Sequence, residues 1–345
     1  MYGSGGLRAN PAALRTRFPT TASRSEGKYP MIVYTDSIKY AEQVLSPGLS
    51  WKSVPPKSVN GEVGGVVANL FHTDSITACT VDWNQVWNYL FVVKSSPESQ
   101  YDTLIRLAQT EKQLPDGILC LAGSGSKLRG FKNRAWVGLE GNIHLSAFLA
   151  PGQKVDHFGV GFTILSAVSV IEAIDFIESL EKKACVKWVN DILIENSKVS
   201  GVLAHTQSQG EIVTSAVLGI GLNVESTPHV ERDPFVPRVA SLRDFVPSPN
   251  KCNQRLIFNR LARCLDRNYR LLLSGQYHRL LDFYRQRSLV IGREVSIYPD
   301  AGGDTSEELV SGRVISIGEN LELYLDGIKT PVSKGRLVLK SQTAT

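Results

Sequence analysis

Three apolar stretches follow one another between residues 185 and 224 with only short turns between them, and this spacing most constrains the fold. The stretches are CVKW, DILIENSKVSGVLAHT and EIVTSAVLGIGLNV, and the second turns back on itself at Glu195, Asn196 and Ser197. Aliphatic and β-branched residues are typical of strands, and polar residues at the turns favour hairpins. Parallel strands need a long crossover, so the short turns predict an antiparallel meander rather than a doubly wound parallel sheet.

Helical patterns on both sides of the meander predict an α+β fold, with helices packed on a mixed, largely antiparallel sheet. Within residues 158–184 isoleucine and valine recur at spacings of three and four, which predicts a long helix lying across the sheet. A helix over about 100–113 stands between two strand patterns, and a helix pair covers roughly 253–287 with a break at Ser274 and Gly275. Beyond about residue 288, short β-runs separated by glycines predict a small SH3-like β-barrel.

The same patterns divide the chain into four parts. The predicted boundaries are 1–28 for an N-terminal tail, 29–90 for a small α/β module, 91–288 for the main domain and 289–345 for the SH3-like C-terminal domain. The small module begins with a β-branched run and a helix cap at Asp36 or Ser37. Its chemistry is not evident from its residues.

Charge and cysteine content weigh against several classes of protein. The formal net charge is +5, but residues 1–28 contain five basic residues against Glu26 alone, so the remaining residues sum to only +1. Because no basic stripe is left to follow a phosphate backbone and residues 29–90 contain no basic recognition helix, we expect no DNA partner. We expect no membrane partner either, since we identify no apolar run near the length of a membrane span. The five cysteines are far apart and lack metal-site spacing, which favours reduced thiols.

The N-terminal tail leaves two interpretations open. Its first 25 residues contain four arginines and no acid, a composition typical of an organelle transit peptide. Glycines and Pro11 interrupt an amphipathic helix, so a disordered tail is equally compatible. We therefore expect a cytoplasmic protein unless residues 1–28 direct it to a mitochondrion or plastid.

The stretch KWVND places charge and turn residues inside the apolar meander. In a strand, Lys187 points away from the face of its neighbours Val186 and Trp188, and the strand ends at Asn190 and Asp191. On the next strand Lys198 is followed by Gly201, which leaves space for a ligand or another backbone. Such a cluster could bind an anion. The alternative is that both lysines are exposed sheet residues, beside an ordinary turn and a bulge.

A second feature, AGSGSKLRGFKNRAW, interleaves glycines with cations and ends at Trp136. Such a loop can wrap around a ligand, offer backbone N–H groups and offset phosphate charge with Arg129, Lys132 and Arg134. The alternative is a solvated loop whose charges serve solubility. The loop alone is weak evidence, but it precedes GNIHLS, a helix, KWVND, KVSG and GIGLNV in this order.

This order of motifs resembles the biotin–protein ligases of the biotin/lipoate ligase superfamily, over roughly residues 90–340. The family's K-W-P-N-D is similar to KWVND, its K-x-x-G-x-L to KVSGVL, and its G-x-G-x-N-V to GIGLNV. The resemblance implies a catalytic domain like that of class II synthetases, followed by the SH3-like domain.

The resemblance also implies a two-step ligase reaction. Biotin and ATP would form biotinyl-5'-AMP, and a lysine of a biotin carboxyl carrier domain would then attack this acyl-adenylate. The substrates would be biotin and ATP with Mg²⁺, which phosphate oxygens would largely hold, so we expect no metal site built from protein side chains. The partners would be the carrier domains of biotin-dependent carboxylases.

The implied site residues fall into two groups. The catalytic cations would be Lys187, at the carboxylate and α-phosphate, with Arg129 and Arg134 over the phosphates. Biotin and ATP would be bound by Ser99, Gln100, Gly130, Lys132, Trp136, Asn190, Asp191, Lys198, Gly201 and Asn223.

The sequence departs from the family pattern at two places, of which the first should change turn rigidity only. Val189 replaces the usual proline, and the glycine-rich loop has Ser126, Leu128 and Phe131 where glutamine, glycine and arginine are usual. The degenerate loop favours a non-catalytic protein that binds carrier domains as one alternative. A lipoate or octanoate ligase of the same fold is the other.

Overall fold

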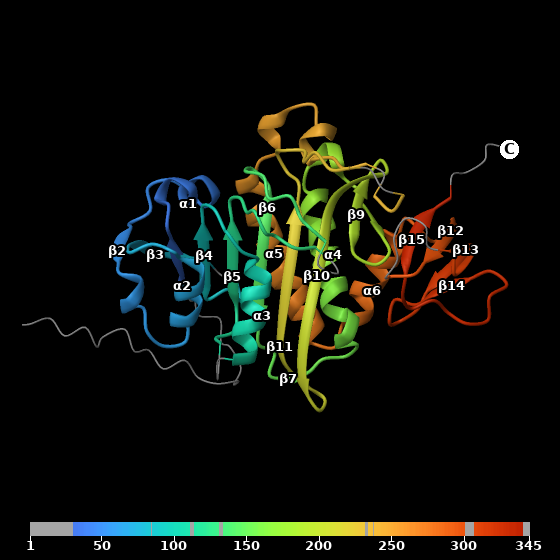
Figure 1. The fold of residues 1–345 in the computed structure, drawn as a ribbon, viewed down its shortest axis with the longest axis horizontal. Helices are drawn as coiled ribbons and strands as arrows, with labels where there is room; N and C mark the ends of the chain where they lie inside the picture. Colours follow the sequence, from blue (N-terminus) through green and yellow to red (C-terminus); the bar gives the residue numbers. More distant parts are fainter. Residues whose placement is uncertain are drawn as a thin grey trace, which may run out of the picture.

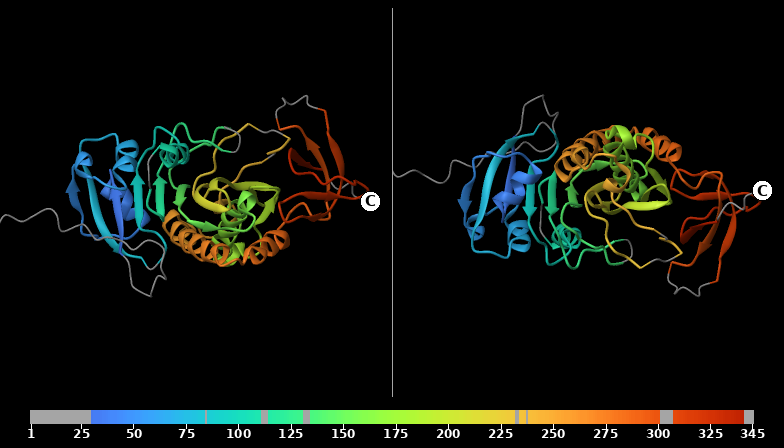
Figure 2. Two further views of the ribbon diagram at one scale, coloured as in Figure 1. Left: turned by 90° about the horizontal axis from the view of Figure 1, so that it is seen from below. Right: turned by 90° about the horizontal axis from the view of Figure 1, so that it is seen from above.

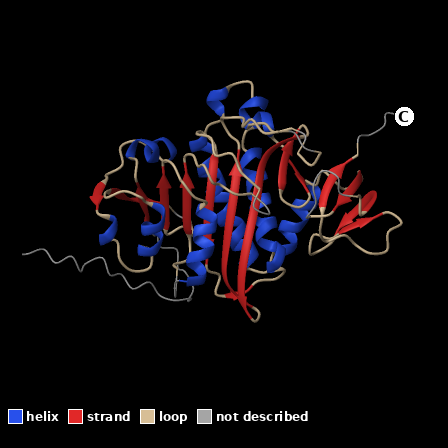
Figure 3. Cartoon of the chain, viewed as in Figure 1, coloured by secondary structure: helices blue, strands red, loops and turns tan. Residues whose placement is uncertain are grey.

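The structure is a computed structural model that describes residues 30–83, 85–110, 114–130, 134–231, 234–236, 238–300 and 307–340. In this part of the chain a large β-sheet crosses the middle of the molecule, and a smaller sheet lies at the C-terminal end (Figure 1). Figure 3 shows the helices packed around the strands of the large sheet.

The large sheet has eleven strands in the described residues, ordered β2-β3-β1-β4-β5-β6-β11-β10-β9-β8, with β7 paired to β11. Their bounds are β1 Pro30–Thr35, β2 Lys52–Val54, β3 Ile76–Asp82, β4 Tyr89–Val93, β5 Ile118–Ala122, β6 Ile143–Leu149, β7 Gln153–Lys154, β8 Cys185–Lys187, β9 Asp191–Ile194, β10 Ser197–Gln209 and β11 Ile212–Leu222. Among these described strands, β1 with β4 and β4 with β5 are parallel, and the other pairs are antiparallel. The predicted mixed, largely antiparallel sheet is confirmed.

Helices cover both faces of this sheet, and Figure 2 shows α3 and α5 on opposite faces. The α-helices are α1 Ile38–Val44, α2 Gly64–Leu70, α3 Gln100–Thr110, α4 Phe158–Asp175, α5 Gln254–Leu273 and α6 Tyr277–Gln286. Short 3-10 helices are η2 Pro56–Ser58, η4 Glu178–Leu180, η5 Leu242–Phe245 and η6 Pro249–Lys251. The predicted break between α5 and α6 is confirmed, because Ser274 ends α5 and Gly275 has a positive φ of 73°.

The strand alternation separates two apolar cores. In β4, Leu90 and Val92 belong to the core that contains residues of α1, α4 and α5, whereas Phe91 and Val93 belong to the core with α2 and α3. This is the period of two that a strand buried on both faces requires.

Helix α4 corrects one expectation from the sequence. It has 18 residues with a mean hydropathy of 1.6, so by length and composition it could cross a membrane, and the prediction that no such run exists is wrong. However, 67% of the helix is buried inside the molecule, where it packs against β10, β11 and α5. Its composition is therefore that of a core helix.

The smaller sheet contains β12 Glu294–Tyr298, β13 Val310–Ile317, β14 Leu323–Leu325 and β15 Arg336–Leu339, in the antiparallel order β14-β13-β12-β15. The predicted small C-terminal β-unit is confirmed, and an isolated bridge between Leu323 and Val332 adds to its pairing. Buried residues of this sheet join the same apolar core as α4 and α5.

The N-terminal segment extends the large sheet. Strands β1, β2 and β3 continue it beyond β4, and the predicted boundary at residue 90 lies within β4. Residues 30–93 therefore share hydrogen bonds and core with the rest of the sheet.

Candidate functional site

A pocket of about 200 Å³ lies over the middle of β10 and β11, beside the first turn of α3. Three segments form its walls: residues 99–101 at the start of α3, the glycine-rich loop at 128–130 and 134–137, and residues 228–239 of the loop after β11, as far as the structure describes them. The pocket thus gathers segments that are far apart in the sequence.

Glycines form the floor of this pocket and admit two aromatic rings. Gly201 and Gly221 are paired across β10 and β11. A Cβ atom on Gly221 would lie 2.4 Å from the ring of Trp136, and one on Gly219 would lie 3.0 Å from the ring of Tyr101. These rings therefore rest on the sheet only because side chains are missing beneath them.

Trp136 is also held by a hydrogen-bonded histidine. The indole Nε1 donates to His144 Nδ1 at 3.2 Å, and His144 Nε2 lies 3.0 Å from the carbonyl oxygen of Leu139. Because an indole N–H can only donate, Nδ1 accepts and Nε2 carries the hydrogen that is donated to Leu139. Burial lowers the pKa of His144, so the neutral ring that this arrangement requires is favoured.

The glycine-rich loop forms a short hairpin over the pocket. Gly130 N donates to Arg134 O at 2.7 Å, and Trp136 N donates to Leu128 O at 2.9 Å. Arg129 lies 3.5 Å from Asp102 of α3, but both side chains are about half exposed, so this ion pair adds little stability. Arg129 and Arg134 therefore bring positive charge to the edge of the pocket.

Lys198 and Asp191 form a less exposed ion pair at the pocket floor. Lys198 Nζ lies 2.6 Å from Asp191 Oδ1, and both side chains are less than one-fifth exposed. Asn190 next to them donates from Nδ2 to Val202 O at 2.8 Å. The turn after β8 is thereby fixed against β10.

Lys187 is buried but lies outside the set of described residues that line the pocket. Only 6% of its surface is exposed, and its Nζ donates to the carbonyl oxygen of Phe235 at 2.5 Å. Phe235 belongs to the same loop as the pocket residues Val236 and Val239. Lys187 is thus not an exposed sheet residue. It contacts the loop after β11, which forms one wall of the pocket and is called the covering loop below.

Two pocket side chains carry buried polar atoms without partners among the described residues. These atoms are the amide nitrogen and the amide oxygen of Gln100 and the Oδ1 atom of Asn223. Gln100 is only 3% exposed and Asn223 is fully buried. Leaving such groups unpaired costs about 1–3 kcal/mol each, so their presence in a pocket indicates a polar ligand.

The structure brings most of the predicted site residues to this one pocket. The lining includes Ser99, Gln100, Arg129, Gly130, Arg134, Trp136, Asn190, Asp191, Lys198, Gly201 and Asn223. Lys187 lies at the covering loop instead, and Lys132 lies outside the described residues.

Three further groups were not predicted from the sequence. Tyr101 and His144 hold the walls, and the segment 228–239 supplies apolar residues such as Val230. His144 stands in the GNIHLS motif, which was a usable signal. The covering loop offered none beyond its prolines.

Comparison with known proteins places the central segment in a family. Residues 92–223 match the biotin/lipoate A/B protein ligase family. The chain is 28% identical over 201 residues to the bifunctional ligase/repressor BirA of Bacillus subtilis, covering 56% of this chain and 59% of that protein. It is 28% identical over 265 residues to the biotin–[acetyl-CoA-carboxylase] ligase of Mycobacterium tuberculosis, covering 73% and 89%.

The fold is also that of a solved biotin protein ligase. The structure of the biotin protein ligase from Aquifex aeolicus in complex with biotin and ATP has a TM-score of 0.54 with 20% identity, over 73% of this chain and 98% of that chain. Matches to the two Bacillus relatives span only 59% and 54% of their lengths. The matched segment 92–223 contains the glycine-rich loop, the floor glycines and both KWVND and KVSG, and this segment of the chain is similar to the biotin/lipoate A/B protein ligase family.

Proposed function

We propose that this chain is a biotin–protein ligase, which forms biotinyl-5'-AMP from biotin and ATP and transfers biotin to a lysine of a biotin carboxyl carrier domain. The observation that carries the proposal is the buried amide of Gln100 in the pocket wall, which has no hydrogen-bond partner among the residues that the structure describes. A ureido group has both N–H donors and a carbonyl acceptor, so it can pair with both ends of that amide. The Mycobacterium relative, named a biotin–[acetyl-CoA-carboxylase] ligase, supports the same substrate.

The charges at the pocket suit the joining of a carboxylate to a phosphate. Two anions repel each other strongly in a site that excludes water, so cations must lie beside them. Arg129 and Arg134 stand at the pocket edge, and Lys198 lies at its floor. Lys187 donates to Phe235, the residue before the pocket residue Val236, and its flexible stem would let it exchange this carbonyl for a substrate oxygen.

Magnesium fits this site as a companion of the nucleotide. Within the described residues, no group of three or more His, Cys, Asp or Glu side chains is placed to hold a metal ion. Mg²⁺ binds ATP mainly through phosphate oxygens and few protein ligands, and would neutralise phosphate charge there. Asp191 and Glu231 line the pocket and could supply one ligand each.

Biotin fits the pocket better than lipoate or octanoate do. Neither the octanoyl chain nor the dithiolane ring has the donors and acceptors that the Gln100 amide needs. A pocket with a buried polar group strongly disfavours an analogue that leaves the group unpaired. The test is to incubate the protein with ATP, Mg²⁺ and biotin, lipoate or octanoate and to detect the acyl-AMP by mass spectrometry. We expect only biotinyl-AMP, and the absence of any acyl-AMP would favour a non-catalytic binding protein.

Lys187→Ala tests the catalytic role of the buried lysine. Losing a cation that stabilises the forming acyl-phosphate should slow adenylate formation by about 100-fold or more. Lys154→Ala is the matched control, because Lys154 is an exposed lysine paired with Glu211 and should leave the rate unchanged. Both variants should keep the circular dichroism spectrum of the native protein. Full activity of Lys187→Ala would show that another group supplies the charge.

A further inference from the structure

Three parallel strands end at the same edge of the sheet, next to the pocket. Strands β4 and β5 lead into the segments that contain Gln100 and Arg129, and β1 runs parallel to β4 with Thr35 paired to Val92. The N-terminal segment therefore delivers its own strand end, with helix α1, to the edge where the pocket segments begin.

The first contact of this strand end is with the segment that follows β4. Asp36 Oδ1 accepts a hydrogen bond from Lys94 N at 2.9 Å. Burial raises the pKa of Asp36, although its hydrogen bonds oppose the shift. Thr35 and Ser37 brace the turn, and Ser37 caps α1 by accepting from Tyr40 N.

The second contact is between α1 and the beginning of the glycine-rich loop. Tyr40 is 8% exposed, and a Cβ atom on Gly123 would lie 2.9 Å from its ring and 2.6 Å from the carbonyl oxygen of Lys94. Gly123 is the first residue after β5. The loop therefore leaves the sheet pressed between Tyr40 and Lys94, which fixes the direction in which it continues toward Arg129.

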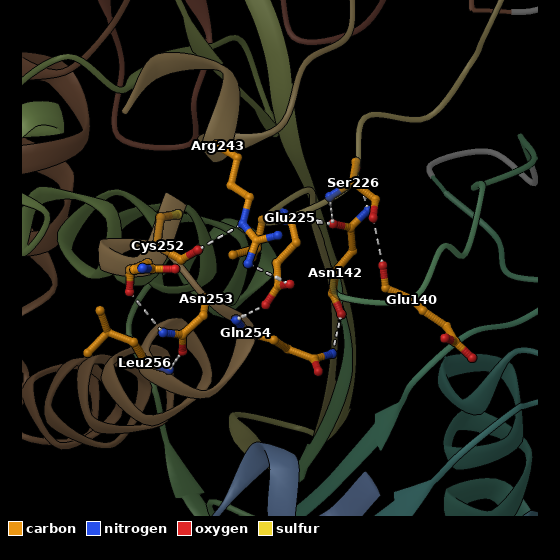
Figure 4. A network of polar contacts seen from close by, with 11 residues as sticks. Glu140, Asn142, Glu225, Ser226, Arg243, Cys252, Asn253, Gln254 and Leu256 are labelled. Carbon is orange, nitrogen blue, oxygen red and sulfur yellow. Dashed lines mark hydrogen bonds and ion pairs between the residues drawn. The ribbon is translucent and has the colours of Figure 1, made fainter. Parts of the chain in front are cut away.

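The hydroxyl of Tyr40 joins a hydrogen-bond network that extends to the start of the loop after β11. It accepts from Gln254 Nε2 at 3.0 Å, and the same nitrogen donates to Asn142 O at 2.6 Å. Figure 4 shows Asn142 between Gln254 and the start of the covering loop. Asn142 Oδ1 accepts from the backbone N–H groups of residues 224–226, the first residues of that loop.

We propose that the β1–α1 unit is a positioning element of the ligand pocket, and that the ring of Tyr40 sets the path of the glycine-rich loop. The proposal rests on the proposed function for its substrate, biotin, but not for its geometry. Tyr40 does not touch the pocket: its ring acts on the glycine-rich loop through Gly123, and its hydroxyl separately joins the Gln254 network. The 29–90 segment would thereby have a role in shaping the pocket.

The test compares Tyr40→Leu with Val44→Ala. Val44 is fully buried on the same helix and lies outside both the loop and the pocket, so Val44→Ala weakens the packing of α1 without touching Gly123. Hydrogen exchange of the Gly125 and Gly130 amides, which are bonded to Gly138 and Arg134, reports the order of the loop without any ligand. During turnover, the rate at which biotinyl-AMP escapes into solution shows how well the glycine-rich loop stays closed over the pocket.

We expect Tyr40→Leu to speed exchange at both amides, and release of biotinyl-AMP, by about tenfold, and Val44→Ala to change neither by more than about twofold. Tyr40→Phe keeps the ring and should exchange like the native protein. Equal effects of Tyr40→Leu and Val44→Ala, or fast exchange in Tyr40→Phe, would overturn the role of the ring.

Gly123→Ala is a second variant that removes nothing from the core, in case Tyr40→Leu does not fold. Its new methyl group would meet Tyr40 and Lys94 and should speed exchange at the same amides. Native exchange in Gly123→Ala would overturn the proposal. A native protein that makes no biotinyl-AMP would refute the ligase function, whereas the exchange comparison would still decide the positioning role.

Discussion

At the scale of single residues, the site depends on glycines, which have no side chains, at its floor. Gly221 and Gly219 let Trp136 and Tyr101 approach β11 to within contact distance, and Gly201 is paired with Gly221 on the neighbouring strand. These glycines do not need positive φ angles here. They are required because a side chain would occupy the place of a ring.

Gly221→Ala should therefore disturb the site much more than Gly201→Ala. The new Cβ at position 221 would lie 2.4 Å from the indole of Trp136, whereas the nearest atom to a Cβ at position 201 is 3.4 Å away and belongs to the flexible end of Lys198. We expect a loss of about 1–3 kcal/mol in stability for Gly221→Ala and less than about 1 kcal/mol for Gly201→Ala. Urea unfolding followed by tryptophan fluorescence measures both, and similar losses would contradict the contact.

Single residues were predictable from sequence where their chemistry is local. Spacing alone indicated that Lys198, Asp191 and Gly201 would come together, because a hairpin of known length places them side by side. The partner of Lys187 was not predictable, since Phe235 is 48 residues away in a loop without periodicity. The sequence suggested that Gly201 leaves space for a ligand, and the structure shows that Gly219 and Gly221 beside it admit aromatic rings of the chain itself.

At the scale of elements, strand β6 holds the glycine-rich loop through one histidine. His144 accepts from Trp136 of the loop and donates to Leu139, just before β6. The helices and strands were largely predictable because their apolar periods are strong. This link between a strand and a loop was not, because it depends on which tautomer the buried environment selects.

The loop should therefore weaken as the pH falls below about 6.5. Burial lowers the pKa of His144, so the unfolded chain takes up a proton at a pH where the folded ring stays neutral. Stability is then fully present above pH 6.5 and decreases by at most about 1.4 kcal/mol for each pH unit below it, until the folded ring is also protonated. Thermal unfolding at pH 7 and pH 5 measures the decrease.

His144→Phe is the control for this dependence. The variant cannot titrate at position 144, so its melting temperature should fall less between pH 7 and pH 5 than that of the native protein, although it is less stable at pH 7. An equal decrease in both proteins would assign the pH dependence to other groups.

At the scale of the whole molecule, one turn of the C-terminal unit is bound to helix α6 and to the residue that follows β8. Trp188 Nε1 donates to Leu321 O at 2.7 Å, Arg285 Nε donates to Ile317 O at 2.8 Å, and the hydroxyl of Tyr277 donates to Glu319 O. Three alternate carbonyl groups of the turn are thus bound by side chains of the main body. Because Trp188 follows Lys187 directly, the C-terminal sheet is attached to the strand end that carries the proposed catalytic lysine.

Trp188→Phe should loosen the C-terminal sheet and slow adenylate formation together. The variant keeps an aromatic ring but leaves the Leu321 carbonyl without its indole donor, a loss of about 1–3 kcal/mol. Since the buried residues of both sheets form one core, we expect the native protein to unfold in one calorimetric transition and the variant to show an earlier transition of the C-terminal sheet. Trp51→Phe is the matched control. The indole of Trp51 also donates one hydrogen bond, to Glu42, but Trp51 belongs to the N-terminal segment and does not contact the turn. Equal behaviour of the two variants would show that the turn does not couple the sheets, whereas slower adenylate formation in Trp188→Phe alone would show that the C-terminal sheet holds the KWVND turn in place.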